Sequence, residues 1–352
     1  MRHPAMLREI FGSKNGLCGT GLTLLDNLSG FLTGRQAGRG PLFVSWDISD
    51  RCNAQCLMCD RWRKQTSDDI SMEKRLLILE KLAGSGVKIL SICGGEPFLM
   101  EGFGDFLKEA KKLGLRVNVT TNGSLILRNP ELIKYLDILT VSIDSHIAHE
   151  HDRVRGFPGL FARISRSIDA VRRQAVRPRI YARRLVTKAN IGRIADYIDH
   201  WRGKVDRIVF QPVHESPQIG FRVPEEFLTN DGKGKDLEAG FRRALKKNRL
   251  SDPYNKGIFD FLFSPEEIKK RFNCYSGFFS LEIDNRGVLW NCGEHKLALG
   301  DLTNKPILEI INDARLPMLR LRGSRACLCY HNCALINIYL SKTVNLLNLH
   351  NA

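Results

Sequence analysis

The chain has 352 residues, enough for one large α/β domain and a smaller one, and its 43% hydrophobic and 26% charged residues are typical of a folded globular protein. No apolar run approaches the ~20 residues that a transmembrane helix needs, so the sequence predicts no membrane-spanning segment. The formal net charge of +16 leaves three partners open: nucleic acid, an acidic membrane surface and an anionic substrate. Nucleic acid is unlikely among these, because the basic residues are dispersed and lack interleaved aromatic residues.

The ten cysteines are clustered along the chain. Secreted disulfide scaffolds are short and rich in cysteine throughout, whereas clustered thiols in a long chain favour metal or redox work in a reducing compartment. The N-terminal residues carry Arg2, Arg8 and Glu9 without a long apolar core, which is atypical of a signal peptide. We therefore expect a cytoplasmic protein without a disulfide framework.

Strands and helices alternate after an N-terminal arm, residues 1–40, whose one pattern is a short helical face of leucines. Strands are predicted at 42–48, 87–93, 115–120, 138–143, 180–186 and 205–210, and helices at 72–83 (with Ser71 as N-cap), 103–113, 131–136, 160–174 and 191–201. Such alternation predicts parallel strands joined by right-handed crossovers. The expected fold is α/β: a partial (β/α)6 TIM-like barrel over 41–214, with functional loops at the carboxyl ends of the strands.

The alternation stops after the barrel. Residues 215–273 are predicted to be a linker with amphipathic helices. Residues 274–352 are predicted to form a small Cys-rich domain with a β-hairpin, whose strands are 279–283 and 288–290.

Three thiols follow the first predicted strand, in Cys52-Asn-Ala-Gln-Cys56-Leu-Met-Cys59. From one tight loop they can converge on a single metal centre. A structural zinc site needs four protein ligands, and an iron–sulfur cluster is normally held by four thiolates, so three cysteines leave one position open for a reacting ligand. The spacing alone also allows a zinc knuckle.

This loop resembles the CxxxCxxC loop of the radical S-adenosylmethionine (SAM) enzymes, although Met58 stands where that family often has an aromatic residue. The resemblance implies a [4Fe–4S] cluster held by Cys52, Cys56 and Cys59, whose free iron chelates SAM. It also implies that SAM is reductively cleaved to a 5′-deoxyadenosyl radical, which abstracts hydrogen from a substrate. A reductant of the flavodoxin or ferredoxin type is implied as well.

A second motif follows the next strand and matches the family's "GGEP" motif, which binds the amino group of SAM. Its residues here are Gly94, Gly95, Glu96 and Pro97. Glycines permit a close backbone approach to a ligand, and a carboxylate accepts hydrogen bonds from an ammonium group.

Polar residues after the third and fourth strands extend the resemblance. Ser142 and Asp144 resemble ribose-contacting positions, and Asn122 is a further candidate. For Ser142 and Asn122, turn or cap chemistry is the alternative. Arg155 belongs to an Asp-x-x-Arg-Gly element that implies a contact with the SAM carboxylate or the substrate, and a guanidinium fork suits a carboxylate.

Five further cysteines lie near the C-terminus: Cys274, Cys292, Cys327, Cys329 and Cys333. Their pattern resembles the auxiliary-cluster domains called SPASM and, when shorter, twitch, although the last three are closer together than in the full SPASM pattern. The implied arrangement is one auxiliary [4Fe–4S] cluster held by Cys274, Cys292, Cys333 and either Cys327 or Cys329. A zinc ribbon with four cysteines is the alternative.

The combined motifs predict a radical SAM enzyme in which the protein positions a substrate hydrogen and excludes water and oxygen. The substrate stays open: a small anionic metabolite, a sugar or natural-product intermediate, or a peptide, as in maturases of ribosomally made peptides. A hypothesis from another class is a zinc-stabilised nucleic-acid-binding protein, which would give the GGEP motif no purpose.

Overall fold

The computed structural model describes residues 17–64, 68–213, 242–243, 276–293, 297–315 and 317–318. In these residues the strands form one 9-stranded sheet with the order β6-β5-β4-β3-β2-β1-β7-β8-β9. The first six strands are parallel, and each pairs with the next in the chain. They are β1 (Phe43–Asp47), β2 (Ile89–Cys93), β3 (Arg116–Thr121), β4 (Ile138–Ser142), β5 (Arg179–Val186) and β6 (Arg207–Pro212). This arrangement confirms the predicted α/β fold with a partial (β/α)6 barrel.

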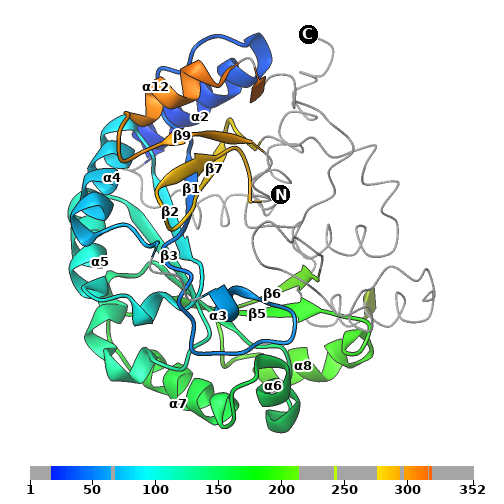
Figure 1. Cartoon of the computed structure of the whole chain (residues 1–352). Coiled ribbons are helices and arrows are strands. Elements are labelled where there is room, and N and C mark those ends of the chain that lie inside the picture. Colours follow the sequence, from blue (N-terminus) through cyan, green and yellow to red (C-terminus); the bar gives the residue numbers. More distant parts are fainter. Residues whose placement is uncertain are drawn as a thin grey trace.

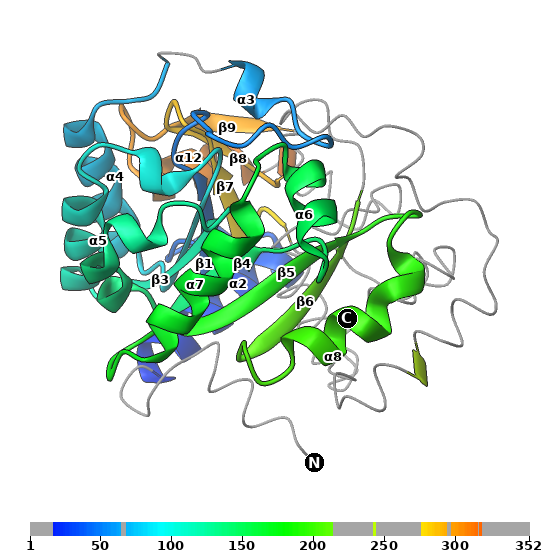
Figure 2. The same ribbon diagram turned by 90° about the horizontal axis from the view of Figure 1, so that it is seen from below.

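Helices cover the outside of the curved sheet, in the order α4, α5, α7 and α8 around it (Figures 1 and 2). The described α-helices are α2 (Leu17–Thr33), α3 (Arg61–Lys64), α4 (Met72–Ser85), α5 (Phe103–Lys112), α6 (Ala148–Arg155), α7 (Leu160–Arg172), α8 (Ile194–Trp201) and α12 (Ile307–Asp313). Short 3₁₀ turns are η1 (Pro97–Leu99), η2 (Ile126–Arg128), η3 (Pro130–Tyr135) and η4 (Ile191–Arg193). None of these described helices combines the length and the apolar character that a membrane crossing requires.

Apolar periodicity explains why these segments pack as they do. All five residues of β1 are buried, as expected of a central parallel strand covered on both faces. On α5 the buried side chains are Phe103, Phe106, Leu107 and Ala110, one face of a helix. Phe106 packs edge-to-face on Trp46 of β1, with ring centroids 5.5 Å apart.

Most predicted bounds lie within two residues of the observed ones. The Ser71 side chain accepts a hydrogen bond from the Lys74 amide and caps α4, as predicted. Two predicted helices differ: 131–136 is the 3₁₀ turn η3, and 191–201 divides into η4 and α8. Helix α6, helix α12 and strand β9 (Ala298–Asp301) were not predicted. The predicted linker 215–273 lies outside the described residues except for 242–243.

The predicted hairpin is present as β7 (Ser280–Ile283) and β8 (Val288–Trp290), but it does not stand apart from the barrel. Strand β7 pairs in parallel with β1, and Phe43 lies opposite Ser280. The apolar residues Leu281 and Ile283 are buried in the same core as β1. The C-terminal hairpin therefore continues the barrel sheet beyond β1.

Helix α2 is anchored to the strand-start end of the barrel. Its buried Asn27 donates to the Gly40 carbonyl and accepts from the Leu42 amide, at the entrance to β1. Its Thr23 hydroxyl donates to the Gly86 carbonyl, where α4 ends. These bonds place α2 opposite the carboxyl ends of the strands.

Candidate functional site

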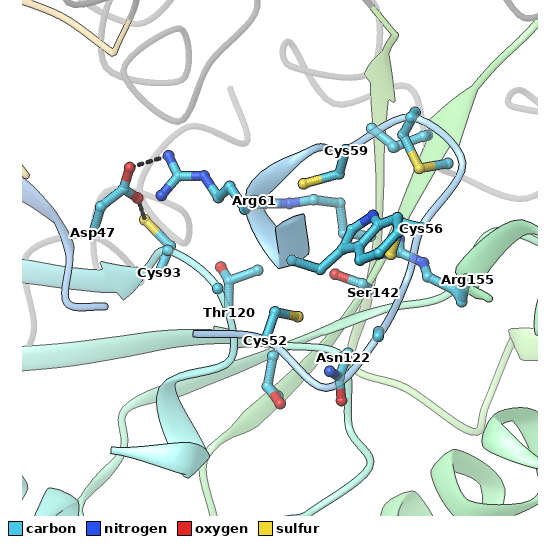
Figure 3. Close-up of a pocket in the computed structure, with 18 of the residues that line it drawn as sticks. Asp47, Cys52, Cys56, Cys59, Arg61, Cys93, Thr120, Asn122, Ser142 and Arg155 are labelled. Atoms are coloured by element: carbon cyan, nitrogen blue, oxygen red, sulfur yellow. Dashed lines mark hydrogen bonds and ion pairs between the residues drawn. The ribbon is translucent and has the colours of Figure 1, made fainter. Parts of the chain in front are cut away.

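A cavity that is open to solvent lies at the carboxyl ends of the parallel strands (Figure 3). The last residues of β1 to β4 all line it, namely Asp47, Cys93, Thr121 and Ser142. In α/β barrels this end of the sheet holds the functional loops. The cavity is therefore where the sequence-predicted site residues are expected to meet.

The three cysteines of the loop after β1 surround this cavity. Cys52, Cys56 and Cys59 all line it, and each is partly buried. Burial raises the pKa of Cys52 to about 12, and burial also raises the pKa values of Cys56 and Cys59. A bound metal centre would offset the thiolate charges that burial disfavours. Three thiols from one loop on one cavity thus fit a four-iron cluster with an open iron.

The GGEP turn fixes the backbone that leads into the cysteine loop. The Gly95 amide donates to the Ser49 carbonyl at 2.7 Å, and the Glu96 amide donates to the Arg51 carbonyl at 2.8 Å. A Cβ atom at Gly95 would overlap with the Arg51 carbonyl oxygen. Gly94 and Gly95 both line the cavity, so their missing side chains admit the cysteine loop as well as a ligand.

Glu96 lies beneath this turn and does not line the cavity. Its side chain is fully buried and accepts hydrogen bonds from the Thr121 hydroxyl, the Asn122 amide and the Phe98 amide. Burial raises the pKa of Glu96 to about 7, although all three hydrogen bonds favour the charged form. Pro97 begins η1 and is likewise absent from the cavity wall.

Asn122 connects the end of β3 to the cysteine loop. Its side-chain amide donates to the Asn53 side chain at 2.8 Å, and Asn53 donates to the Ser124 hydroxyl at 3.0 Å. Asn122 also lines the cavity, beside Ser142 of β4. Asn53 was not among the predicted site residues, because the spacing of the cysteines gives no sign of what their intervening residues contact.

Arg155 lines the same cavity and joins the cysteine loop to β4. Its Nε is 2.6 Å from Asp144 Oδ2, and its Nη1 donates to Cys56 Sγ at 3.8 Å. Asp144 is buried and also accepts from the Leu185 amide. The Asp144 carboxylate is the main reason that the pKa of Arg155 is raised against the opposing effect of burial.

Asp144 itself lines a second cavity. Met58 and Leu185 line both cavities, so they form the wall between them. Met58 is almost fully buried and packs with Val213. A thioether fills this position well, which gives a packing reason for Met where an aromatic residue was expected.

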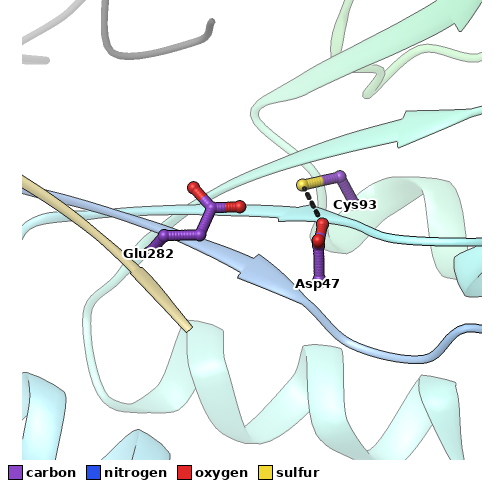
Figure 4. Close-up of side chains that lie close together, drawn as sticks. All are labelled: Asp47, Cys93 and Glu282. Atoms are coloured by element: carbon purple, nitrogen blue, oxygen red, sulfur yellow. Dashed lines mark hydrogen bonds between the residues drawn. The ribbon is translucent and has the colours of Figure 1, made fainter. Parts of the chain in front are cut away.

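A further polar group lies on β1, β2 and β7 at the wall of the first cavity: Asp47, Cys93 and Glu282 (Figure 4). One ligand atom of each lies within 4.8 Å of the others. The Cys93 thiol donates to Asp47 Oδ1 at 3.2 Å, and burial raises the pKa of Glu282 well above its ordinary value. Arg61 of α3 forms ion pairs with Asp47 and Asp50. Asp47, Cys93 and Glu282 were not among the predicted site residues.

Of the auxiliary cysteines, only Cys292 lies within the described residues. It is buried two residues after the end of β8, and its neighbour Gly293 lines the first cavity. Cys274, Cys327, Cys329 and Cys333 lie outside the described residues.

Comparison with known proteins gives a consistent family. The profile of the Radical SAM superfamily matches residues 46–198, which span β1 to α8 and include the cysteine loop. The AdoMet-dependent heme synthase of Methanosarcina barkeri is 30% identical over 141 residues, which are 38% of this chain and 40% of that protein. The sporulation killing factor maturation protein SkfB of Bacillus subtilis is 25% identical over 293 residues, 82% of this chain and 69% of that protein. The matched segment is therefore less than half of the heme synthase and about two thirds of SkfB.

Two solved structures share the fold. Streptococcus suis SuiB bound to S-adenosylmethionine has a TM-score of 0.59 at 16% identity, over 85% of this chain and 70% of that one. anSMEcpe with bound AdoMet and a peptide has a TM-score of 0.60 at 17% identity, over 80% of this chain and 82% of that one. At these identities the likeness shows the fold alone. Together with this shared fold, the profile match shows that residues 46–198 form a radical SAM domain.

Proposed function

We propose that this chain reductively cleaves SAM and uses the 5′-deoxyadenosyl radical to abstract hydrogen from a substrate. The observation that carries the proposal is that Cys52, Cys56 and Cys59 line one cavity at the carboxyl ends of the barrel strands. The cluster would supply the electron for SAM cleavage. Hydrogen-bonded contacts to the barrel fix the loop that holds it, through Gly95 and Asn122.

The remaining predicted SAM contacts are part of the proposal. Ser142 lines the first cavity, and Asp144 lines the second. Because Met58 lies in the wall between the two, a ligand that spans both would pass Met58. Three of the four lone-pair positions of the Glu96 carboxylate accept hydrogen bonds from the protein, and Glu96 does not line the cavity. We therefore assign Glu96 first to the support of the β3 loop and, through that loop, to the shape of the binding site.

An auxiliary [4Fe–4S] cluster held by Cys274, Cys292, Cys333 and either Cys327 or Cys329 is a separate proposal. It is supported by the resemblance of their spacing and by the position of Gly293 on the wall of the cavity. This cluster would exchange an electron with the product or substrate radical. A flavodoxin- or ferredoxin-type reductant would serve the SAM cluster. Such thiol chemistry fits the cytoplasm, where thiols stay reduced.

A peptide substrate is the second candidate function, and it is favoured by the length of the match to SkfB. That match covers 82% of this chain and continues well beyond the radical SAM domain. The test is whether a mixed library of short synthetic peptides stimulates the formation of 5′-deoxyadenosine. An equal mass of free amino acids is the control, and equal stimulation by both would contradict a peptide substrate.

The main proposal is tested on protein purified without oxygen. Iron and sulfide are quantified in the wild type and in a variant with Cys52, Cys56 and Cys59 all changed to Ala. Dithionite and SAM are then added, and 5′-deoxyadenosine is measured. We expect about eight irons per wild-type chain, about four in the variant, and 5′-deoxyadenosine from the wild type alone.

Other results separate the proposals. About four irons in the wild type and none in the variant would retain SAM cleavage but remove the auxiliary cluster. Zinc in place of iron would overturn the enzyme proposal and favour a zinc-stabilised binding protein. Iron without 5′-deoxyadenosine would overturn SAM cleavage.

A further inference from the structure

Arg155 is held against one particular thiol of the cysteine loop. Its Nη1 is 3.8 Å from Cys56 Sγ, while its Nε is 2.6 Å from Asp144 Oδ2. The side chains of Arg155 and Asp144 are only 11% and 3% exposed. Water therefore screens this set of charges little.

The backbone around Arg155 is fixed to the same loop. The Leu57 amide donates to the Val154 carbonyl at 3.0 Å, one residue before Arg155 and one after Cys56. Gly156 ends α6 with a φ of 57°, and a Cβ there would overlap with the Gln55 carbonyl oxygen. The guanidinium thus has a defined place relative to the Cys56 sulfur and does not depend on a ligand to hold it there.

We propose that Arg155 is a positioning residue that sets the reduction potential of the SAM-binding cluster through the sulfur of Cys56. The carboxylate of Asp144 partly opposes the effect of Arg155 on this potential. This inference rests on the proposed function, because it requires the cluster. Reduction adds one negative charge to a cluster, and cations or hydrogen bonds at its sulfurs favour that reduced form. Arg155 would raise the potential, and the carboxylate of Asp144 would lower it.

The two partners therefore predict shifts of opposite sign. Removing the cation in Arg155→Gln should make reduction harder. Removing the carboxylate charge in Asp144→Asn should make it easier. A residue that merely supports the fold would not produce this pair of signs. A role confined to binding SAM would leave the potential of the SAM-free protein unchanged.

The experiment is a redox titration of the SAM-free cluster, followed by electron paramagnetic resonance, in protein purified without oxygen. To isolate this cluster, every protein compared carries Cys292→Ala, and the protein with Cys292→Ala alone is the reference. For Arg155→Gln we expect the ratio of reduced to oxidised cluster at a fixed potential to fall at least tenfold, a shift of ~59 mV for a one-electron couple. Asp144→Asn should shift the potential in the positive direction, and Arg155→Lys, which keeps the charge, should shift it less than Arg155→Gln.

Arg193→Gln is the matched control. Arg193 also pairs with a carboxylate, Glu150, and lines the second cavity, but it is half exposed. Its loss should leave the potential unchanged.

The outcomes keep this inference and the proposed function apart. An intact cluster with an unshifted potential in Arg155→Gln would overturn the role of Arg155 and leave SAM cleavage standing. If Arg155→Gln fails to hold iron, the sign of the Asp144→Asn shift decides: positive supports the role, and zero or negative overturns it. A wild-type chain without a four-iron cluster at this loop overturns the proposed function itself.

Discussion

Among single residues, Glu96 shows how far a side chain's surroundings can depart from what its motif suggests. The carboxyl group is fully buried, and burial raises its pKa from 4.5 to about 7. The folded state then binds a proton that the unfolded state has released between these pH values. Stability from this group is complete below pH 4.5 and is lost as the pH rises through 7.

Comparison of the wild type with Glu96→Gln isolates this effect. The free energy of unfolding of the wild type, measured relative to that of Glu96→Gln, should fall by about 3 kcal/mol between pH 4.5 and 7. Urea unfolding at several pH values, without SAM, measures it. Glu101→Gln, which removes a carboxyl group at an exposed position nearby, is the control variant. A flat difference for Glu96→Gln would mean that folding does not raise the pKa of Glu96.

Gly95 gives a second prediction at the same scale. In Gly95→Ala the new methyl group would overlap with the Arg51 carbonyl and displace the loop that carries Cys52. We expect the iron content after anaerobic reconstitution to fall from about eight towards about four irons per chain, the number that the auxiliary cluster would retain. Gly84→Ala is the control, because nothing lies within 4 Å of a Cβ there and the residue belongs to a helix. Undiminished iron in Gly95→Ala would show that the loop tolerates the displacement.

The sequence could predict which residues meet at the cavity. It could not predict the hydrogen bonds and ion pairs that hold them there. Cys52, Gly94 and Ser142 are placed by motifs that follow strands, and all three line the cavity. The bonds of Asn53 and the ion pairs of Arg61 join residues from separate strands and loops. Those contacts depend on the folded backbone and leave no periodic pattern in the chain.

At the level of elements, apolar periodicity identified the six parallel strands but not α6. Helix α6 buries His151 and Arg155, so its inward face carries polar side chains and has no apolar stripe. The pairing of β7 with β1 was also outside the reach of pattern analysis. A strand's sequence shows that it is buried, but it does not name a partner far along the chain.

Helix α2 offers a test of an element remote from the cavity. In Asn27→Ala the buried Leu42 amide and Gly40 carbonyl would both lose their partner. We expect a loss of about 1–3 kcal/mol in the free energy of unfolding, with iron content unchanged in the folded protein. Thr33→Ala removes two exposed hydrogen bonds at the end of the same helix, to the Ser29 carbonyl and from the Arg35 amide, and should cost much less. Equal losses in the two variants would contradict the anchoring role of Asn27.

For the molecule as a whole, the hairpin protects one edge of the barrel sheet. Leu281 is 2% exposed on β7, in register with Val44 of β1. An aspartate there would place a charge in the core and detach the hairpin, which would expose β1 as an unpaired edge that invites association. We expect Leu281→Asp to elute as soluble oligomers or aggregates in size-exclusion chromatography.

The hairpin turn provides the control for that variant. Arg286 lies at the turn with its side chain 56% exposed, so Arg286→Ser should elute as the wild type does. A Leu281→Asp protein with wild-type elution and thermal stability would show that β1 does not depend on β7.

The pairing of Phe43 with Ser280 also has a consequence for how the protein folds during its synthesis. Ribosomes add about 5–20 residues per second, so roughly 10 to 50 seconds pass between the synthesis of these two strands. During this interval the six parallel strands can assemble, but β1 still lacks its second neighbour, β7. A contact this distant in sequence forms late and slowly. The nascent barrel therefore has an unpaired β1 edge for tens of seconds. In a chain whose synthesis stops before β7, this edge of β1 stays unpaired.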